Sequence, residues 1–347
     1  MSRKLVIRII LAIALLILIF QFFTSQTKIE PVHIDGKTMG SIAYNVKYTV
    51  DNNINYKSKI DSILVSLNNA LSTYIRDSEI SQLNQLQMIQ GPSAMFMDVL
   101  KKSEEIWITT YGAFDPTIGP LVNAWGFGPS GKPNFLDSVV VDSLIQYVGF
   151  GKLLFNQDKI EMEPGMYLDF SAIAKGYAVD LVAEFLEKKK IENYMVEIGG
   201  EVRVKGNNGQ GDPWKIGIED PLVSKQERKL LAITELSDIS MATSGNYRNY
   251  YEKDGKTVAH TIDPRTGFNA QNNVLSASVF AEECVTADAY ATAIMVLGLD
   301  ASKALLNENN IDAIIIYSEG DEIGAYVSQN IASAVNFVGD INQSPVQ

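Results

Sequence analysis

A carboxylate and a hydroxyl are spaced to share one face of a helix. Asp288 and Thr292 are four residues apart in 286–293, a segment with the pattern of a helix start. Side chains at i and i+4 lie on the same face, and these two oxygen groups can both bind a hard cation such as Mg²⁺. Two protein ligands do not complete a magnesium site, so phosphates and waters would supply the rest. An ordinary helix surface explains the same pair without function.

Lys175 follows a segment that predicts an anion site. Residues 169–176 open a helical pattern, and Asp169 or Ser171 could be its N-cap. The N-terminus of a helix attracts anions because its amides are free and its dipole is positive there. Lys175, one turn into the helix, could reach the same anion. The alternative is simple capping, with the lysine in solvent.

His260 is a candidate base. It precedes 263–267, where Asp-Pro and Thr-Gly pairs predict a rigid turn. The other histidine, His33, lies near the N-terminus, and two histidines cannot make a multi-histidine metal site. A base must be held in place, which a rigid turn can do. A structural histidine would fit the same position.

Three further segments combine glycine with small or polar residues. Residues 112–117 follow a helical pattern that Gly112 would end. The glycines of 197–201 allow a tight turn and a close approach of the backbone, and 242–248 contains a second small-residue turn. A capped loop and a plain hairpin explain these features equally well.

The elements that must position these residues predict an α+β domain with mixed sheets. Apolar spacing predicts helices over 57–71, 95–111 and 172–190, and one that begins at 287. Alternating or apolar runs predict strands at 41–50, 194–198, 201–205, 214–218, 275–280 and 313–317.

Composition excludes several classes of function. Cys284 is the only cysteine, so an internal disulfide is impossible, and we expect it to be a small buried residue. The 29 basic and 41 acidic residues give a net charge of −12. This balance argues against nucleic acid or anionic lipid as the main partner. A bound nucleotide would need a cation or backbone amides to hold it.

The N-terminus predicts a membrane anchor. Residues 5–23 are apolar apart from Arg8, and as a helix they would be about 28 Å long, close to the thickness of a bilayer core. Arg3 and Lys4 precede the run, so the positive-inside rule places the remaining chain on the exported side of the membrane. A cleaved signal peptide is the alternative, although no small-residue cleavage site follows. We therefore expect an anchor at 1–23, a connector at 24–37 and a catalytic domain at 38–340.

Taken in order, the motifs of residues 38–300 resemble the FAD:protein FMN transferase family, also called the ApbE family. The matching segments are Met39-Gly40-Ser41, Ser72-Thr73-Tyr74 with Ser78-Glu79 and Leu83-Asn84, 112–117, Trp125-Gly126-Phe127-Gly128, 169–176, Glu197-Ile198-Gly199-Gly200, Thr243-Ser244-Gly245, 260–267 and 287–292. Many family members carry a lipid on a cysteine after the signal peptide. This chain lacks that cysteine, and a transmembrane helix would replace the lipid.

The resemblance implies FAD as substrate, Mg²⁺ as cofactor and transfer of FMN to a threonine hydroxyl, with release of AMP. It implies an acceptor among the flavoprotein subunits of membrane redox pumps. It further implies that His260 is the base, that Lys175 stabilises phosphoryl charge, and that Ala172 (through its carbonyl), Asp288 and Thr292 bind the metal. The implied FAD contacts are Met39, Tyr74, Ala113, Phe114, Asp115, Asp169, Lys175 and Ile262.

Two other readings use the same residues. A Mg²⁺-dependent FAD pyrophosphatase would use the same site with water as the acceptor. A flavin-binding protein without catalysis would keep FAD intact in the presence of Mg²⁺. Asp288, Thr292 and His260 favour a catalyst, because binding alone does not need a base.

Overall fold

The computed structural model describes residues 31–50, 54–129, 136–223, 229–245, 250–253, 256–259, 261–320, 322–339 and 341–343. The expected anchor, 1–23, and His260 lie outside the described residues. Within the ranges given, no helix is both long and apolar enough to cross a membrane.

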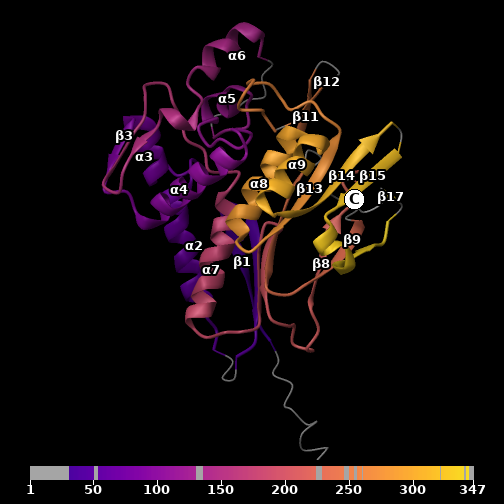
Figure 1. The fold of residues 1–347 in the computed structure, drawn as a ribbon. Coiled ribbons are helices and arrows are strands. Elements are labelled where there is room, and N and C mark those ends of the chain that lie inside the picture. Colours follow the sequence, from indigo (N-terminus) through magenta and orange to yellow (C-terminus); the bar gives the residue numbers. More distant parts are fainter. Residues whose placement is uncertain are drawn as a thin grey trace, which may run out of the picture.

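A nine-stranded sheet forms the centre of the molecule (Figure 1). Its neighbouring strands pair antiparallel, except that the last pair, β15 and β17, is parallel. In spatial order the strands are β1 (Val32–Thr38), β2 (Ile42–Tyr48), β6 (Tyr194–Ile198), β7 (Glu201–Lys205), β10 (Ile239–Gly245), β13 (Val274–Ala281), β14 (Asp312–Glu319), β15 (Glu322–Val327) and β17 (Asn342–Gln343). The expected α+β class with mixed sheets is confirmed.

Helices pack on one face of this sheet and enclose the larger core. These are α2 (Lys57–Leu71), α4 (Ala94–Thr109), α7 (Ala174–Lys188) and α8 (Cys284–Leu297). α8 contacts β10 and β13 as well as α7, so it lies directly on the sheet. It is buried on nearly every side, including Cys284, as expected from the sequence.

A second, smaller sheet covers the opposite face. It consists of β8 (Trp214–Glu219), β9 (Leu230–Leu236) and β16 (Val335–Phe337). Ala313 and Ile315 of β14 belong to the helical core, whereas Ile314 and Ile316 pack with β8 and β9. Side chains alternate between the faces of a strand, so a strand buried on both sides has a continuous apolar sequence.

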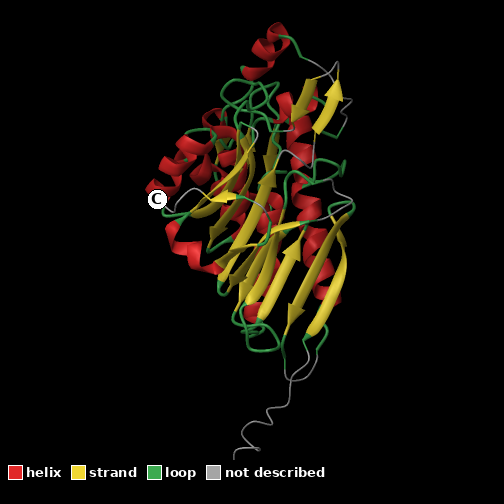
Figure 2. Cartoon of the chain, turned by 90° about the vertical axis from the view of Figure 1, so that its right-hand side faces the viewer, coloured by secondary structure: helices red, strands yellow, loops and turns green. Residues whose placement is uncertain are grey.

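The remaining elements surround this framework, and Figure 2 shows many of the loops gathered beyond one end of the sheet. They are α3 (Glu79–Leu86), α5 (Gly119–Ala124), α6 (Ser138–Ile145), α9 (Leu299–Asn309), β3 (Met88–Gln90), β4 (Leu154–Phe155), β5 (Lys159–Glu161), β11 (Tyr250–Lys253), β12 (Lys256–Ala259) and the 3₁₀ turns η1 (Phe150–Lys152) and η2 (Gln329–Ala334).

Two expectations need correction. The connector predicted at 24–37 is wrong from Val32 onward, because that part is strand β1 at the edge of the sheet. Its side chains alternate: Ile34 and Thr38 are buried, and the charged residues between them are exposed. This alternation is typical of an edge strand with one face in solvent. The helix expected from 172 begins at Ala174, and Ile173 at its N-cap makes no side-chain capping bond.

Candidate functional site

Segments that are far apart in sequence meet at one end of the central sheet. The β1–β2 turn holds Met39, and the β6–β7 turn beside it donates a hydrogen bond from the Gly199 amide to the Ala43 carbonyl, at 3.0 Å. At the same end β10 finishes with Gly245, paired to Ser276 near the start of β13. The sheet register therefore brings three of the predicted motifs together.

The backbone of these turns has the conformation that their residues favour. Gly199 and Gly200 have φ of 65° and 102°, as a two-residue hairpin turn with positive φ at both positions requires. Met39, which is not a glycine, also has a positive φ, of 46°. Residues other than glycine adopt this region uncommonly, so the β1–β2 turn holds Met39 in a constrained conformation.

Lys175 lies between two buried carboxylates. Its ammonium contacts Oε1 of Glu201 and is 3.4 Å from Oδ1 of Asp288. Both carboxylate side chains are 3% exposed, whereas the lysine side chain keeps 27% of its surface accessible. Lys175 is therefore ion-paired, unlike the solvated lysine of the alternative interpretation, and its side chain is still partly open to solvent.

The electrostatics of the cluster keep the lysine charged. Burial alone would lower the pKa of Lys175, but the carboxylates of Asp288 and Glu201 raise it above its ordinary value. Burial raises the pKa of Glu201, and Asp288 adds to that effect while Lys175 opposes it. Oε2 of Glu201 is buried and finds no hydrogen-bond partner among the described residues. The cluster is therefore an ion pair with one surplus carboxylate.

Helices α7 and α8 cap each other at the site. Asp288 of α8 accepts a hydrogen bond from the Gly176 amide in the first turn of α7, at 2.9 Å. Asp180 of α7 accepts bonds from the first two amides of α8, those of Cys284 and Val285, at 3.0 and 2.8 Å. Neither helix has a side-chain cap at its own N-cap residue. Each carboxylate satisfies amides that a helix start leaves free and complements its dipole.

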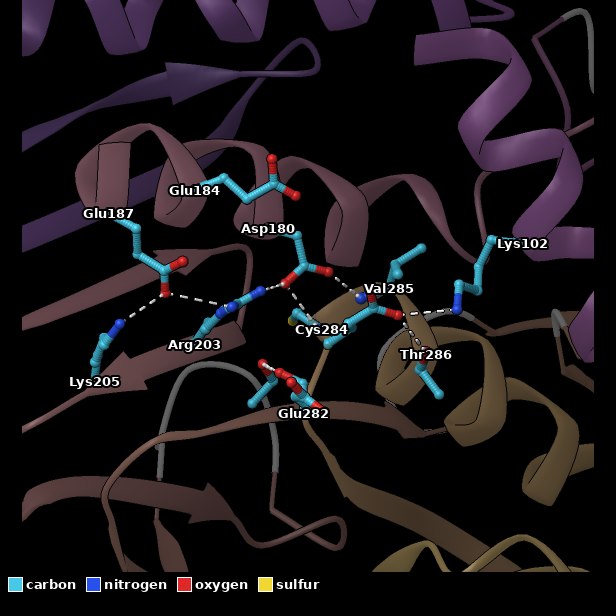
Figure 3. A network of polar contacts seen from close by, with 12 residues as sticks. Lys102, Asp180, Glu184, Glu187, Arg203, Lys205, Glu282, Cys284, Val285 and Thr286 are labelled. Atoms are coloured by element: carbon cyan, nitrogen blue, oxygen red, sulfur yellow. Dashed lines mark hydrogen bonds and ion pairs between the residues drawn. The ribbon is translucent and has the colours of Figure 1, made fainter. Parts of the chain in front are cut away.

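The Asp180 cap continues into a network of charges (Figure 3). Arg203 of β7 donates to Asp180 at 2.7 Å and also contacts Glu187, which Lys205 approaches to 3.5 Å. Burial raises the pKa of Asp180 to about 6, although the α8 amides and Arg203 oppose that rise. The network anchors the start of α8 to α7 and β7, which fixes Asp288.

The three predicted metal ligands lie where these helices meet. Asp288 and Thr292 are both on α8, and Ala172 is in the turn before α7. The Oγ1 atom of Thr292 is 3.4 Å from the Ser244 hydroxyl of β10. Within the described chain no group of three or more His, Cys, Asp or Glu residues could hold a metal ion. The three predicted ligands would offer a carboxylate, a hydroxyl and a carbonyl oxygen, donor types that suit Mg²⁺, and the Lys175 ammonium lies 3.4 Å from Oδ1 of Asp288.

Asp169 stabilises the turn before α7 rather than the helix itself. Its carboxylate accepts hydrogen bonds from the amide and hydroxyl of Ser171, at 2.8 and 2.5 Å. Asn84 holds this segment through two hydrogen bonds with the backbone of Leu168, at 2.9 and 2.7 Å. Tyr74 is 69% exposed, and desolvation together with the Asp169 carboxylate raises its pKa. Tyr74 and Asp169, two expected FAD contacts, are therefore near each other.

Four of the other predicted FAD contacts, Ala113, Phe114, Asp115 and Ile262, are buried, whereas Met39 is half-buried. Ala113, Phe114 and Ile262 are at most 4% exposed. The Asp115 carboxylate accepts bonds from the amide and hydroxyl of Thr117 and from the amide of Phe150, at 2.6 to 3.0 Å. It closes a turn within the protein, so a ligand contact from 113–115 would come mainly from the backbone.

The turn after His260 is rigid, as the sequence predicted. The guanidinium of Arg265 donates two hydrogen bonds to Asp263, at 2.9 and 2.8 Å. The Asp263 carbonyl accepts from the Gly267 amide, and Trp125 Nε1 donates to the Gly267 carbonyl at 3.0 Å. His260 itself lies outside the described residues, so its role stays a prediction.

Comparison with known proteins supplies the family. The ApbE family model matches residues 39–315. The FAD:protein FMN transferase of Vibrio cholerae is 40% identical over 87% of this chain and 92% of its own, and that of Haemophilus influenzae is 40% identical over 84% and 88%. The structure of the Vibrio cholerae flavin transferase ApbE superposes with a TM-score of 0.79 at 38% identity, covering 88% of this chain and 99% of that one. The chain belongs to the ApbE family, together with these FAD:protein FMN transferases.

Proposed function

We propose that this protein is an FAD:protein FMN transferase, which cleaves FAD and attaches the FMN half to a protein hydroxyl. Family membership over 39–315 and relatives with that activity support the proposal. The observation that carries it is the meeting of Lys175 with Asp288, 113 residues further along the chain, at the N-terminus of α7. A cation beside a carboxylate that can hold a metal ion suits a substrate that carries a pyrophosphate.

The residues present fit a magnesium ion held by Asp288, Thr292 and the carbonyl of Ala172. Mg²⁺, when bound, would neutralise the charge of the FAD phosphates in this acidic molecule and stabilise the charge that builds on them during transfer. Lys175 would bind the same phosphate oxygens. Residues 113–115, Met39, Tyr74, Asp169 and Ile262 would position the rest of FAD.

His260 would accept the proton of the acceptor threonine. The freed oxygen attacks the phosphorus on the FMN side, the bond to the AMP phosphate breaks, and AMP leaves. Positioning and electrostatic stabilisation would provide most of the rate acceleration, as in other phosphoryl transfers.

Thr292 gives a selective test of the metal site. Thr292→Val keeps the shape of the side chain but removes the hydroxyl. We expect weaker Mg²⁺ binding, so that the Mg²⁺ concentration for half-maximal AMP release rises about tenfold. Thr286→Val on the same helix is the matched control, because within the described residues its hydroxyl bonds to Glu283, at 3.4 Å, and not to the cluster. Equal Mg²⁺ dependence in both variants would remove Thr292 from the site.

Incubation with FAD and Mg²⁺ separates transfer from its alternatives. A transferase adds the mass of FMN to a threonine of the acceptor protein, measured by mass spectrometry, and releases one AMP for each addition. A pyrophosphatase would release AMP and free FMN at the same rate without the acceptor. A protein that only binds flavin would leave FAD intact.

We further propose that the protein is anchored in the membrane and that its acceptor is a membrane protein. The apolar run at 5–23 supports a single-pass anchor in the cytoplasmic membrane, with the catalytic domain on the exported side. Flavoprotein subunits of membrane redox pumps with a target threonine would then be within reach. Fractionation of cells should place the full-length chain in the membrane, and a soluble chain that starts near residue 25 would show a cleaved signal peptide.

A further inference from the structure

Glu201 is a buried carboxylate for which the proposed reaction has no role. It is 2% exposed, its Oε1 accepts a hydrogen bond from the Lys175 ammonium, and its Oε2 has no partner within the described part of the chain. A buried carboxylate is costly unless a cation compensates its charge. Lys175 is that cation, and the same ammonium also faces Asp288.

The ammonium and a metal ion would compete for Asp288. Nζ of Lys175 is 3.4 Å from Oδ1 of Asp288, on the carboxylate that is the charged protein ligand in the proposed magnesium site. Two cations on one carboxylate repel each other, so metal binding requires that the lysine has another buried counter-ion. Glu201 already provides the closer of its two contacts.

The β6–β7 turn limits where the lysine can go. A Cβ built on Gly199 would lie 3.5 Å from both Oε2 of Glu201 and Cδ of Lys175, and 2.8 Å from Cγ2 of Ile42. The backbone of the turn therefore lies directly against the Lys175–Glu201 pair. Packing on this side keeps the lysine stem close to Glu201.

We propose that Glu201 is a positioning residue, which holds the Lys175 ammonium to one side of Asp288 so that the lysine and a metal ion can occupy the site together. This inference rests on the magnesium site proposed above. Without the Glu201 charge, Lys175 would depend on Asp288 as its buried counter-ion and would oppose the metal there.

A double-mutant cycle on metal affinity tests this role without any measurement of activity. Mg²⁺ binding to the full-length protein, free of FAD, is measured by titration calorimetry for wild type, Glu201→Gln, Lys175→Gln and the double variant. We expect Glu201→Gln alone to weaken Mg²⁺ binding about tenfold. In the Lys175→Gln background the same substitution should change the affinity less than about threefold, because the effect of Glu201 depends on its contact with Lys175.

The outcomes are distinct. An equal loss with and without Lys175 would mean that Glu201 acts on the metal directly, and no loss in the single variant would mean that it has no effect on the metal; either result overturns the inference. A wild-type protein that binds no Mg²⁺, neither alone nor with FAD present to supply its phosphates, would overturn the proposed magnesium site and this inference with it.

Two further variants control for charge and folding. Glu235→Gln removes a carboxylate from its surface pair with Lys215 on the second sheet, at 3.2 Å, which is the same change in net charge away from the cluster and its supporting network, and it should leave Mg²⁺ affinity within about twofold. If Glu201→Gln fails to fold, Glu201→Asp keeps the charge but shortens its reach to Lys175. It should weaken Mg²⁺ binding about threefold in the presence of Lys175 and not in Lys175→Gln. Unchanged affinity in Glu201→Asp would overturn the inference.

Discussion

Gly176→Ala tests how closely α7 must approach α8 for the site to form. A Cβ at position 176 would lie 2.3 Å from the carbonyl oxygen of Cys284 and 2.8 Å from Cβ of Asp288. Ordinary contacts begin near 3.4 Å, so the helices must separate by about 1 Å. The first contact is with backbone that Asp180 holds in place, so no side-chain rotation can relieve it.

Opposing effects determine how much Gly176→Ala changes the free energy of unfolding. Alanine is better than glycine inside a helix by about 1 kcal/mol. Extra atoms in a packed interior cost about 1–3 kcal/mol, and loss of the Gly176 amide bond to the Asp288 carboxylate costs about 2 kcal/mol more. We expect the free energy of unfolding to fall by about 3 kcal/mol on balance. Mg²⁺ affinity should fall with it, because Asp288 moves away from α7.

Equilibrium unfolding in urea measures the stability, and calorimetry measures the metal affinity of the same samples. Gly151→Ala is the control, because a Cβ there would meet only the Trp107 ring, at 3.5 Å. It should change the unfolding free energy by no more than about 1 kcal/mol. A Gly176→Ala protein as stable as wild type, with unchanged Mg²⁺ affinity, would refute the argument that close packing positions the site.

Three other predictions concern single side chains. Asp288→Ala should nearly abolish AMP release from FAD, because the only charged ligand of the proposed magnesium site is lost; wild-type rates at limiting Mg²⁺ would rule that site out. His260→Ala should slow FMN transfer by roughly 10²–10⁴-fold and leave FAD affinity almost unchanged; a joint loss of FAD affinity and melting temperature would show a packing role instead. Burial raises the pKa of Asp180 to about 6, so the folded protein binds this proton more tightly than the unfolded chain. Its contribution to stability is then full below about pH 4 and lost as the pH rises through about 6. The unfolding free energy of wild type minus that of Asp180→Asn should therefore fall between pH 4 and pH 7, and a rise would contradict the sign.

Local patterns in the sequence predicted the elements whose burial is simple. The helix expected at 57–71 is α2, because its apolar residues repeat at helical spacing and face one core. The strands expected at 194–198 and 201–205 are β6 and β7, because the glycine pair between them fixes the hairpin. Strand β1 was not predicted, because every second residue of an edge strand can be polar and such a sequence resembles a loop. Its pairing with β2 becomes visible only in the folded structure.

In the candidate site, too, local spacing was predictable from the sequence, whereas contacts between distant elements were not. The spacing of Asp288 and Thr292 on one helix was visible in the sequence. Glu201 was missed as a site residue, because its contact with Lys175 depends on how β7 lies against α7. The expected cap at Asp169 or Ser171 was wrong for a related reason: the first turn of α7 takes its capping carboxylate from α8. Only a glycine pair beside an acidic residue at 199–201 hinted at Glu201.

The reciprocal caps also determine when the site can exist during synthesis. Asp288 is 112 residues from Gly176, and Val285 is 105 residues from Asp180. A growing chain that has passed α7 but not α8 contains Lys175 and Glu201, yet its first α7 turn lacks the Asp288 carboxylate. Contacts at such sequence separation form late in folding. An incomplete chain therefore carries Lys175 and Glu201 but not Asp288, the carboxylate that we propose binds the metal, and this cluster is completed only when α8 joins α7.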